Sequence, residues 1–122
     1  MAIPTMRQVL ARAGEEAAAC FLAERGYVIL ARNARLHNGE LDIVARDGRT
    51  LVFVEVKTRA SVRYGKPQEA VERRKQERVR NLALAWMQNH RLNDSACRFD
   101  VIAVRATNEG KVLNVEHFLS SF

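Results

Sequence analysis

Two acids and a lysine on neighbouring apolar segments are the residues of this chain best suited to catalysis. Asp42 lies before an Asp47-Gly48 turn, and Glu55 and Lys57 follow it in a Glu-x-Lys pattern. Carboxylate oxygens are the protein ligands that Mg²⁺ prefers, together with water and phosphate oxygens. A nearby lysine can orient the attacking water or stabilise developing negative charge. The pattern predicts catalytic roles for Asp42, Glu55 and Lys57 in magnesium-dependent hydrolysis of a phosphodiester.

Whether the two acids meet depends on the connection between the two segments. In a strand, alternate side chains share a face, which places Phe53, Glu55 and Lys57 together. A two- or four-residue connection puts Asp42 on that same face, whereas a three-residue connection separates it from Glu55. Asp-Gly favours the two-residue form, so we expect a shared face. The acids are then directly opposite, with Cβ atoms about 5 Å apart, or diagonal at about 7–8 Å.

Carboxylates this close repel each other by about 4 kcal/mol at a separation of ~4 Å and an effective dielectric of ~20. One lysine offsets this only in part, whereas a divalent cation reverses its sign. The backbone carbonyl of Val56 is a candidate for a further ligand. We therefore expect Mg²⁺ as the cofactor, with Mn²⁺ as a substitute, lowering the pKa of bound water. The alternative is a cross-strand salt bridge on a solvated face, which is what an isolated Glu-x-Lys usually forms.

A third carboxylate, Glu15, lies in an alanine-rich segment with helical spacing. Its neighbours one turn away are alanines, apart from Arg12, so it sits at the margin of an apolar face. Gly14 costs about 1 kcal/mol relative to Ala inside a helix. A glycine at such a position often permits close approach of a backbone or a ligand. A functional Glu15 and a peripheral Glu15 paired with Arg12 both fit the sequence.

The second predicted helix carries a basic run, Arg73 to Arg80. On a helical wheel, Lys75 falls in an apolar stripe with Val79, Leu82 and Trp86. A lysine there is costly unless its ammonium group reaches an anion, so Lys75 should face either the acids or a phosphate. Residues that could line a path for a phosphate backbone are Arg59, Arg63, Lys66, Lys75 and Arg78. The alternative for most of the arginines is a solvated helix face.

Composition restricts the class of protein. The chain has 122 residues and a net charge of +6, and sixteen of its twenty basic residues are arginines, which suit phosphate. This favours a nucleic-acid partner, although solubility charge alone would give the same balance. No apolar stretch reaches the ~20 residues of a membrane span, and the first residues do not resemble a signal peptide. Cys20 and Cys97 are expected to be buried and reduced in a cytoplasmic protein.

Turn and capping signals predict the order α-β-β-β-α-β-β in one α/β domain, residues 1–122, with a mixed sheet. A capping box at Thr5 and Gln8 starts a first helix that ends at Arg25 before Gly26. Pro67 is a favoured first residue for the second helix. The remaining expected elements are strands at Tyr27–Arg32, Glu40–Arg46 and Leu51–Thr58, a loop at Asn33–Gly39, a second helix reaching about Asn89, and strands at Phe99–Arg105 and Val112–Phe118.

Several segments together resemble a known bacterial family. They are Gly14-Glu15, Arg32-Asn33, Gly39 to Val44, Val52 to Arg59 and Arg98 to Val101. These resemble the YraN-type proteins, a largely uncharacterised family similar to archaeal Holliday-junction resolvases and to the restriction-endonuclease-like PD-(D/E)xK nucleases. The resemblance covers the chain from about Arg12 onward.

The resemblance implies a restriction-endonuclease-like mixed sheet flanked by helices. It also implies that Glu15 assists Asp42 and Glu55 in holding the metal, and that Gln76 beside Lys75 is a polar site position. The proline of the superfamily motif is missing before Asp42, a departure that many members share.

Three hypotheses follow from these observations. The first is a Mg²⁺-dependent endonuclease acting on DNA, with branched or otherwise structured DNA included. The second is a module on a nuclease-derived fold that binds nucleic acid or protein without cutting. The third is a scaffold with salt-bridged acids. Cleavage of a junction would require two active centres, and so a homodimer, for which the sequence shows no unambiguous surface.

Overall fold

The computed structural model describes residues 2–60 and 73–122. The elements run in the order α1 (Met6–Glu24), β1 (Val28–Leu36), β2 (Gly39–Asp47), β3 (Thr50–Arg59), α2 (Arg73–Asn89), β4 (Cys97–Ala106) and β5 (Val112–Phe118). The predicted order α-β-β-β-α-β-β is confirmed.

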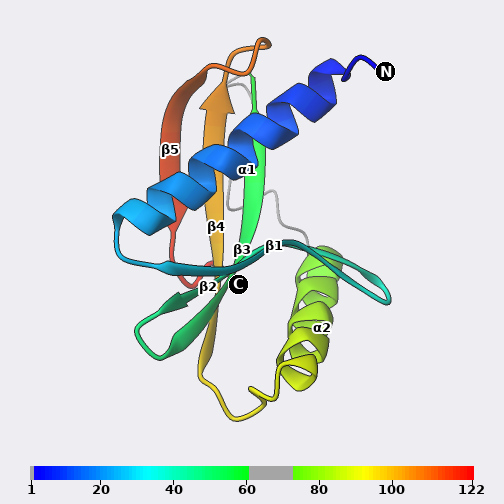
Figure 1. The fold of residues 1–122 in the computed structure, drawn as a ribbon, viewed down its shortest axis with the longest axis vertical. Helices are drawn as coiled ribbons and strands as arrows, with labels where there is room; N and C mark the ends of the chain where they lie inside the picture. Colours follow the sequence, from blue (N-terminus) through cyan, green and yellow to red (C-terminus); the bar gives the residue numbers. More distant parts are fainter. Residues whose placement is uncertain (1, 61–72) are drawn as a thin grey trace.

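One five-stranded sheet has the strand order β1-β2-β3-β4-β5 (Figure 1). Only β3 and β4 are parallel; the other neighbouring pairs among these five strands are antiparallel. The connection between the two parallel strands contains α2, as parallel pairing requires a long crossover. The sheet is therefore mixed, as predicted.

The two helices cover different faces of the sheet, because its strands are apolar on both sides. Beneath α1, a core forms from residues such as Leu22, Ile43 and Val54. Beneath α2, a second core includes Phe53, Leu82 and Trp86. Alternation along β3 thus sends the valines to one helix and Leu51 and Phe53 to the other. Burying both faces fixes the register of this strand.

The first helix begins as its sequence predicts. The side chain of Thr5 accepts a hydrogen bond from the Gln8 backbone N–H, and the Gln8 side chain accepts one from the Thr5 N–H. Gly14 is buried, and a Cβ there would overlap the side chain of Thr58 on β3. The glycine therefore allows α1 to lie close to β3, and this holds Glu15 near that strand.

The first strand is longer than predicted. The segment Asn33–Leu36, expected within a loop, continues β1, pairing Ala34 with Leu41 and Leu36 with Gly39. Asn33 has a positive φ of 50°, which accounts for its turn-like character, yet it remains within the strand. Packing of Ala34 and Leu36 against the core under α2 favours the extended strand.

Other boundaries differ by smaller amounts. β4 begins at Cys97, two residues before the predicted start, while α2 ends at Asn89 and β5 spans Val112–Phe118 as predicted. The start predicted at Pro67 lies outside the described residues. Neither α1 nor the described part of α2 has the length and apolarity needed to cross a membrane.

The expectation of buried cysteines is wrong. Both Cys20 and Cys97 are free thiols, and both are exposed. The buried side of α1 is formed by Gly14, Ala18 and Leu22 together with Ala19. Cys20 lies off that side, and its thiol donates to the carboxylate of Glu16 at 3.5 Å.

Candidate active site

The β2–β3 hairpin brings Asp42 beside Glu55. Its register pairs Asp47 with Thr50 and Ile43 with Val54, so the connection has two residues, as predicted. Gly48 has a φ of 61°, which suits the first central position of a type II′ turn. Continuing the same register past Ile43 sets Asp42 opposite Glu55.

Beyond the Ile43–Val54 pair, the side chain of Asp42 takes the place of a backbone partner for β3. The backbone N–H of Val56 donates to Oδ2 of Asp42 at 2.9 Å. The carboxylate therefore satisfies a β3 amide where backbone pairing with β2 stops. This bond fixes Asp42 at the point where the two strands separate and open a cavity.

Glu55 is only 7% exposed, and two lysines compensate its charge. Lys75 on α2 forms an ion pair with Oε1 of Glu55, and Nζ of Lys57 lies 4.0 Å from the same oxygen. The prediction that Lys75 reaches an anion is thus confirmed, and the anion is the acidic cluster. Burial lowers the pKa of Lys57, and the neighbouring Lys75 lowers it further. Burial also disfavours charge on Lys75, but Glu55, Lys57 and Asp42 together outweigh burial and raise the pKa of Lys75.

The environment of Asp42 opposes its ionisation. Burial, followed by the charge of Glu55, raises the pKa of Asp42 to about 7, against an ordinary value of 3.8. Glu15 raises it further, while the Val56 amide and Lys75 act in the opposite direction. A carboxyl whose pKa is raised by burial and a nearby acid is characteristic of functional sites.

Glu15 faces this region from α1 and is held by β1. The side-chain amide of Asn33 donates to Oε2 of Glu15 at 2.9 Å, and Arg32 pairs with the adjacent Glu16 at 3.0 Å. Within the described part of the chain, no ion pair joins Glu15 to Arg12, so the expected pairing of these two residues is wrong. The positive φ of Asn33 therefore belongs to a residue that orients a site carboxylate.

All of the predicted metal ligands line one cavity of about 510 Å³ between α1, the central strands and α2, whereas Lys57 is not part of its lining. Its polar lining residues are Arg7, Glu15, Asp42, Glu55, Thr58, Arg59 and Lys75, and Val56 lines it as well. Among residues 2–60 and 73–122, no three His, Cys, Asp or Glu side chains are close enough together to form a preassembled metal site. The donors are nevertheless the oxygen ligands that suit Mg²⁺.

A metal would require some rearrangement of these side chains. Asp42 and Glu55 supply two carboxylates, Val56 contributes a backbone carbonyl, and Glu15 stands at the α1 wall. In the structure, the ammonium group of Lys75 provides the positive charge beside Glu55. The donor set therefore fits a divalent cation in composition, provided that Lys75 moves away from Glu55.

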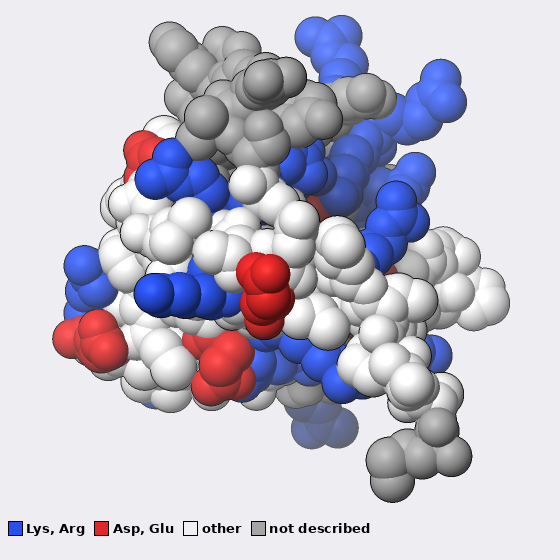
Figure 2. Space-filling view, turned by 90° about the horizontal axis from the view of Figure 1, so that it is seen from above, with Lys and Arg blue, Asp and Glu red and all other residues white. Residues whose placement is uncertain are grey.

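The structure describes only some of the residues that were predicted to contact nucleic acid. Arg59 lines the acidic cavity, and Arg78 lines a neighbouring one. Arg63 and Lys66 lie outside the described residues. Gln76 is half-buried next to Lys75. Viewed from above, a group of Lys and Arg side chains gathers on one side of the molecule, and most of the visible acids lie on the other (Figure 2).

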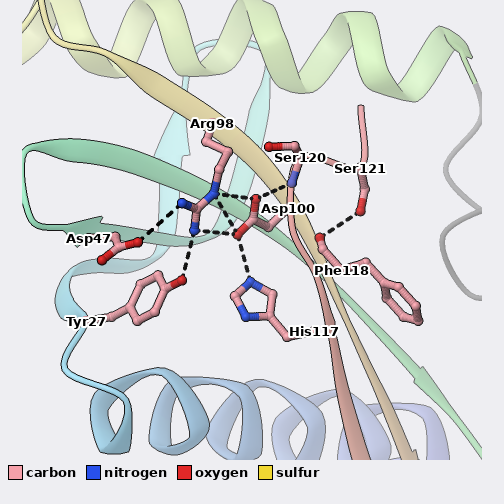
Figure 3. Close-up of polar contacts among 8 residues, drawn as sticks. All are labelled: Tyr27, Asp47, Arg98, Asp100, His117, Phe118, Ser120 and Ser121. Atoms are coloured by element: carbon pink, nitrogen blue, oxygen red, sulfur yellow. Dashed lines mark hydrogen bonds and ion pairs between the residues drawn. The ribbon is translucent and has the colours of Figure 1, made fainter.

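The sequence did not predict a second group of charged residues, which surrounds Asp100. Asp100 on β4 is completely buried, and its carboxylate contacts Arg98, His117 and the backbone N–H of Ser120 (Figure 3). Arg98 extends the cluster to Tyr27 and Asp47. Although burial opposes ionisation, these donors hold the pKa of Asp100 below its ordinary value.

The Arg98-x-Asp100 spacing was a usable signal for part of this cluster, because residues i and i+2 share a strand face. His117 offered no such signal. It reaches Asp100 only through the β4–β5 register, in which His117 pairs with Ile102.

Fold and site together define an α/β protein in which α1, α2 and the central strands enclose an acid-lined cavity. Residues 14–104 match the uncharacterised protein family UPF0102. A UPF0102 protein of Pelotomaculum thermopropionicum is 47% identical over 116 residues, which are 95% of this chain and 97% of the relative. One from Geobacter metallireducens is 48% identical over 109 residues, covering 89% and 88%. One from Pelobacter propionicus is 50% identical over 111 residues, covering 89% and 79%. The chain belongs to the UPF0102 family, as its resemblance to the YraN-type proteins predicts.

Proposed function

We propose that this protein is a metal-dependent nuclease that hydrolyses phosphodiester bonds in DNA, including branched or structured DNA. The observation that carries the proposal is the pairing of Asp42 with buried Glu55 at the point where β2 and β3 separate. Buried acids that repel each other are stabilised by a cation, and a cation beside a phosphate is what such hydrolysis requires. On this proposal the chain forms a single endonuclease-like domain related to the PD-(D/E)xK nucleases.

Each site residue has a role in this proposal. Asp42 and Glu55 would hold Mg²⁺, or Mn²⁺ in its place, together with Glu15 and the Val56 carbonyl. The ion would supply a bound water of lowered pKa and neutralise phosphate charge. Lys57, whose pKa is lowered, lies beside Glu55 and can exchange a proton with the attacking water. Lys75 would leave Glu55 and contact the phosphate.

The ion pair between Lys75 and Glu55 also favours a second candidate function. If that lysine is a permanent counter-ion, the fold is a module that binds nucleic acid without cutting it. The two candidates differ in their metal requirement, because binding alone needs no divalent ion. Both predict binding that weakens as the salt concentration rises.

A cleavage assay tests the proposal. Linear, single-stranded and four-way-junction DNA are incubated with the protein in Mg²⁺, Mn²⁺ or EDTA. We expect cutting only with metal, and a rate lower by at least ~100-fold in Asp42→Asn and Glu55→Gln, equivalent to about 2.7 kcal/mol of transition-state stabilisation. The matched control is Glu109→Gln, which changes an exposed acid in a turn and should leave the rate unchanged.

The assay also separates the two candidates. Identical products from wild type and Asp42→Asn would rule out the nuclease. DNA binding that persists in EDTA, with no cutting in either metal, would instead support the binding module.

A further inference from the structure

A groove leads away from the acidic cavity along α2. A cavity of about 240 Å³ shares Asp42, Glu55 and Lys75 with the acidic cavity. It shares Asn38, Arg78 and Leu82 with a third cavity of about 370 Å³. Because neighbouring cavities share lining residues, they lie in a row that begins at the acids, and we treat this row as one depression. We call the part lined by the third cavity the α2 groove.

The two walls of the α2 groove come from different elements. The turn between β1 and β2 supplies His37 and Asn38, and α2 supplies Arg74, Arg78 and Asn81. These walls lie close together, because a Cβ on Gly39 would be 3.2 Å from Cδ1 of Leu82. The glycine thus lets the turn pack on α2 directly beside the groove.

Charge and hydrogen-bonding capacity in the α2 groove are largely unused. Arg74 and Arg78 are exposed and lie one helical turn apart, about 6 Å along the axis. Within residues 2–60 and 73–122, neither arginine forms an ion pair. The lining of the α2 groove also contains one acid, Glu77. The side chains of Asn38 and Asn81 likewise make no hydrogen bond with another described residue. The groove therefore offers two cations and two amides to a ligand.

We propose that the α2 groove binds unpaired nucleotides adjacent to the phosphodiester held at the acids. This inference rests on the proposed function, whose substrate it specifies. Arg74 and Arg78 contact phosphates of the strand, for which the forked guanidinium group is well suited. The amides of Asn38 and Asn81, on opposite walls, hydrogen-bond the edges of exposed bases.

The size of the groove favours an unpaired strand over a double helix. The cavity of about 370 Å³ is near the lower end of the size range of small-molecule sites, and the cavity of about 240 Å³ is smaller still. A duplex presents its phosphates on a wide, convex surface and cannot enter such a depression. A strand separated from its partner can follow the depression and expose its bases to the asparagines. The substrate is thus DNA with a frayed, forked or single-stranded segment next to the cut.

The test is a binding measurement in EDTA, so that neither metal nor hydrolysis contributes. Fluorescein-labelled single-stranded, forked and fully paired DNA are titrated with wild type and with the double variant Arg74→Ala/Arg78→Ala. We expect the variant to bind single-stranded and forked DNA at least ~10-fold more weakly. The slope of log K against log salt concentration should fall by about 1.4, or ~0.7 for each phosphate that an arginine no longer neutralises.

A matched control separates local interactions from overall charge. Lys111→Ala/Arg91→Asn removes two positive charges at exposed positions outside the three cavities. Its salt slope should equal that of wild type. Equally weakened binding in the two double variants, or weakening confined to fully paired DNA, would overturn the inference.

A charge-neutral substitution gives a second test. Ala85 lines the groove, so Ala85→Leu should obstruct it and weaken single-strand binding, whereas Gln88→Leu on an exposed part of α2 should not. Thermal melts establish that each variant is folded. Unchanged binding by Ala85→Leu together with an unchanged salt slope in the arginine variant would also overturn the inference.

The outcomes distinguish this inference from the proposed function. Groove-dependent binding without cutting by wild type would contradict the nuclease and leave the groove assignment standing. Cutting with the same KM in wild type and Arg74→Ala/Arg78→Ala would contradict the groove and leave the nuclease standing.

Discussion

Asp42 on β2 and Asp100 on β4 are two aspartates in the same sheet with opposite electrostatic surroundings. Asp100 is fully buried, yet an arginine, a histidine and a backbone amide contact its carboxylate, and its pKa is lowered. Asp42 receives one backbone hydrogen bond and lies next to Glu55, and its pKa is raised to about 7. The carboxylate of Asp100 therefore has donors that stabilise its charge, whereas the carboxylate of Asp42 lies among groups that mostly disfavour its charge.

The difference indicates which acid maintains the fold and which is available for chemistry. The Asp100 cluster joins β4 to the C-terminal segment through Ser120 and to the β2–β3 hairpin through Arg98 and Asp47 (Figure 3). Removing its central charge would leave partners buried and unpaired. In the acidic cavity, in contrast, the repulsion between Asp42 and Glu55 would be relieved by a cation that takes the place of the Lys75 ammonium group. The contacts of Asp100 are those of a residue that stabilises the fold, whereas a functional role for Asp42 is part of our proposal.

The largest effect on stability should come from Asp100→Ala. This change removes the acceptor for Arg98, His117 and the Ser120 amide, and breaking such a buried pair costs about 3–5 kcal/mol. That is a large part of the ~5–15 kcal/mol that stabilises a typical domain. Denaturant unfolding monitored by circular dichroism measures it, with Glu109→Ala as the exposed control. A destabilisation below about 1 kcal/mol would contradict the assignment of Asp100 to the fold.

An effect of opposite sign, which depends on pH, should come from Asp42→Asn. The folded protein holds a proton on Asp42 more tightly than the unfolded chain does, because the pKa rises from 3.8 to about 7. The wild type should therefore lose stability as the pH rises through this interval. The asparagine can still accept the Val56 N–H and carries no charge. In EDTA, the variant should match wild type near pH 4 and be more stable than wild type by up to about 4 kcal/mol at pH 8, because each pKa unit corresponds to about 1.4 kcal/mol.

The dependence of stability on pH should also differ between Asp42 and Asp100. The lowered pKa of Asp100 means that its contribution to stability is complete above the ordinary aspartate range and is lost as the pH falls below it. Thermal melts from pH 3 to pH 8 should therefore show opposite trends when each aspartate is removed. If the Asp42→Asn variant were less stable than wild type at pH 8, the claim that Asp42 and Asp100 have opposite electrostatic surroundings would be wrong.

Local sequence signals were sufficient for much of the fold and for part of the site. The capping box at Thr5 predicted the start of α1, and strand alternation predicted the buried faces. The Asp47-Gly48 signal predicted a two-residue connection with Asp42 and Glu55 on one face, but it left open whether the two acids are directly opposite or diagonal. Lys75, placed in an apolar stripe by helical periodicity, was expected to contact an anion and does so. These features depend on residues that are close together in the sequence, so periodicity and turn chemistry determine them.

The features that were missed depend on contacts between distant segments. β1 continues through Asn33 despite a turn-like φ, because Ala34 and Leu36 pack against the core under α2. The cluster around Asp100 needs His117 on another strand. The partner of Glu15 is Asn33, eighteen residues away, and not Arg12, which is one helical turn earlier in α1. Only the assembled sheet brings these pairs together.

The most direct test of our central claim, that Asp42 and Glu55 form a cation site, is a Mn²⁺ titration at pH 8 by electron paramagnetic resonance or calorimetry. The account predicts that wild type binds Mn²⁺ and that Asp42→Asn binds at least ~10-fold more weakly. Lys75→Met should bind more tightly, because the competing ammonium group is gone. No Mn²⁺ binding by wild type, with or without single-stranded DNA, or equal binding by Asp42→Asn, would contradict it.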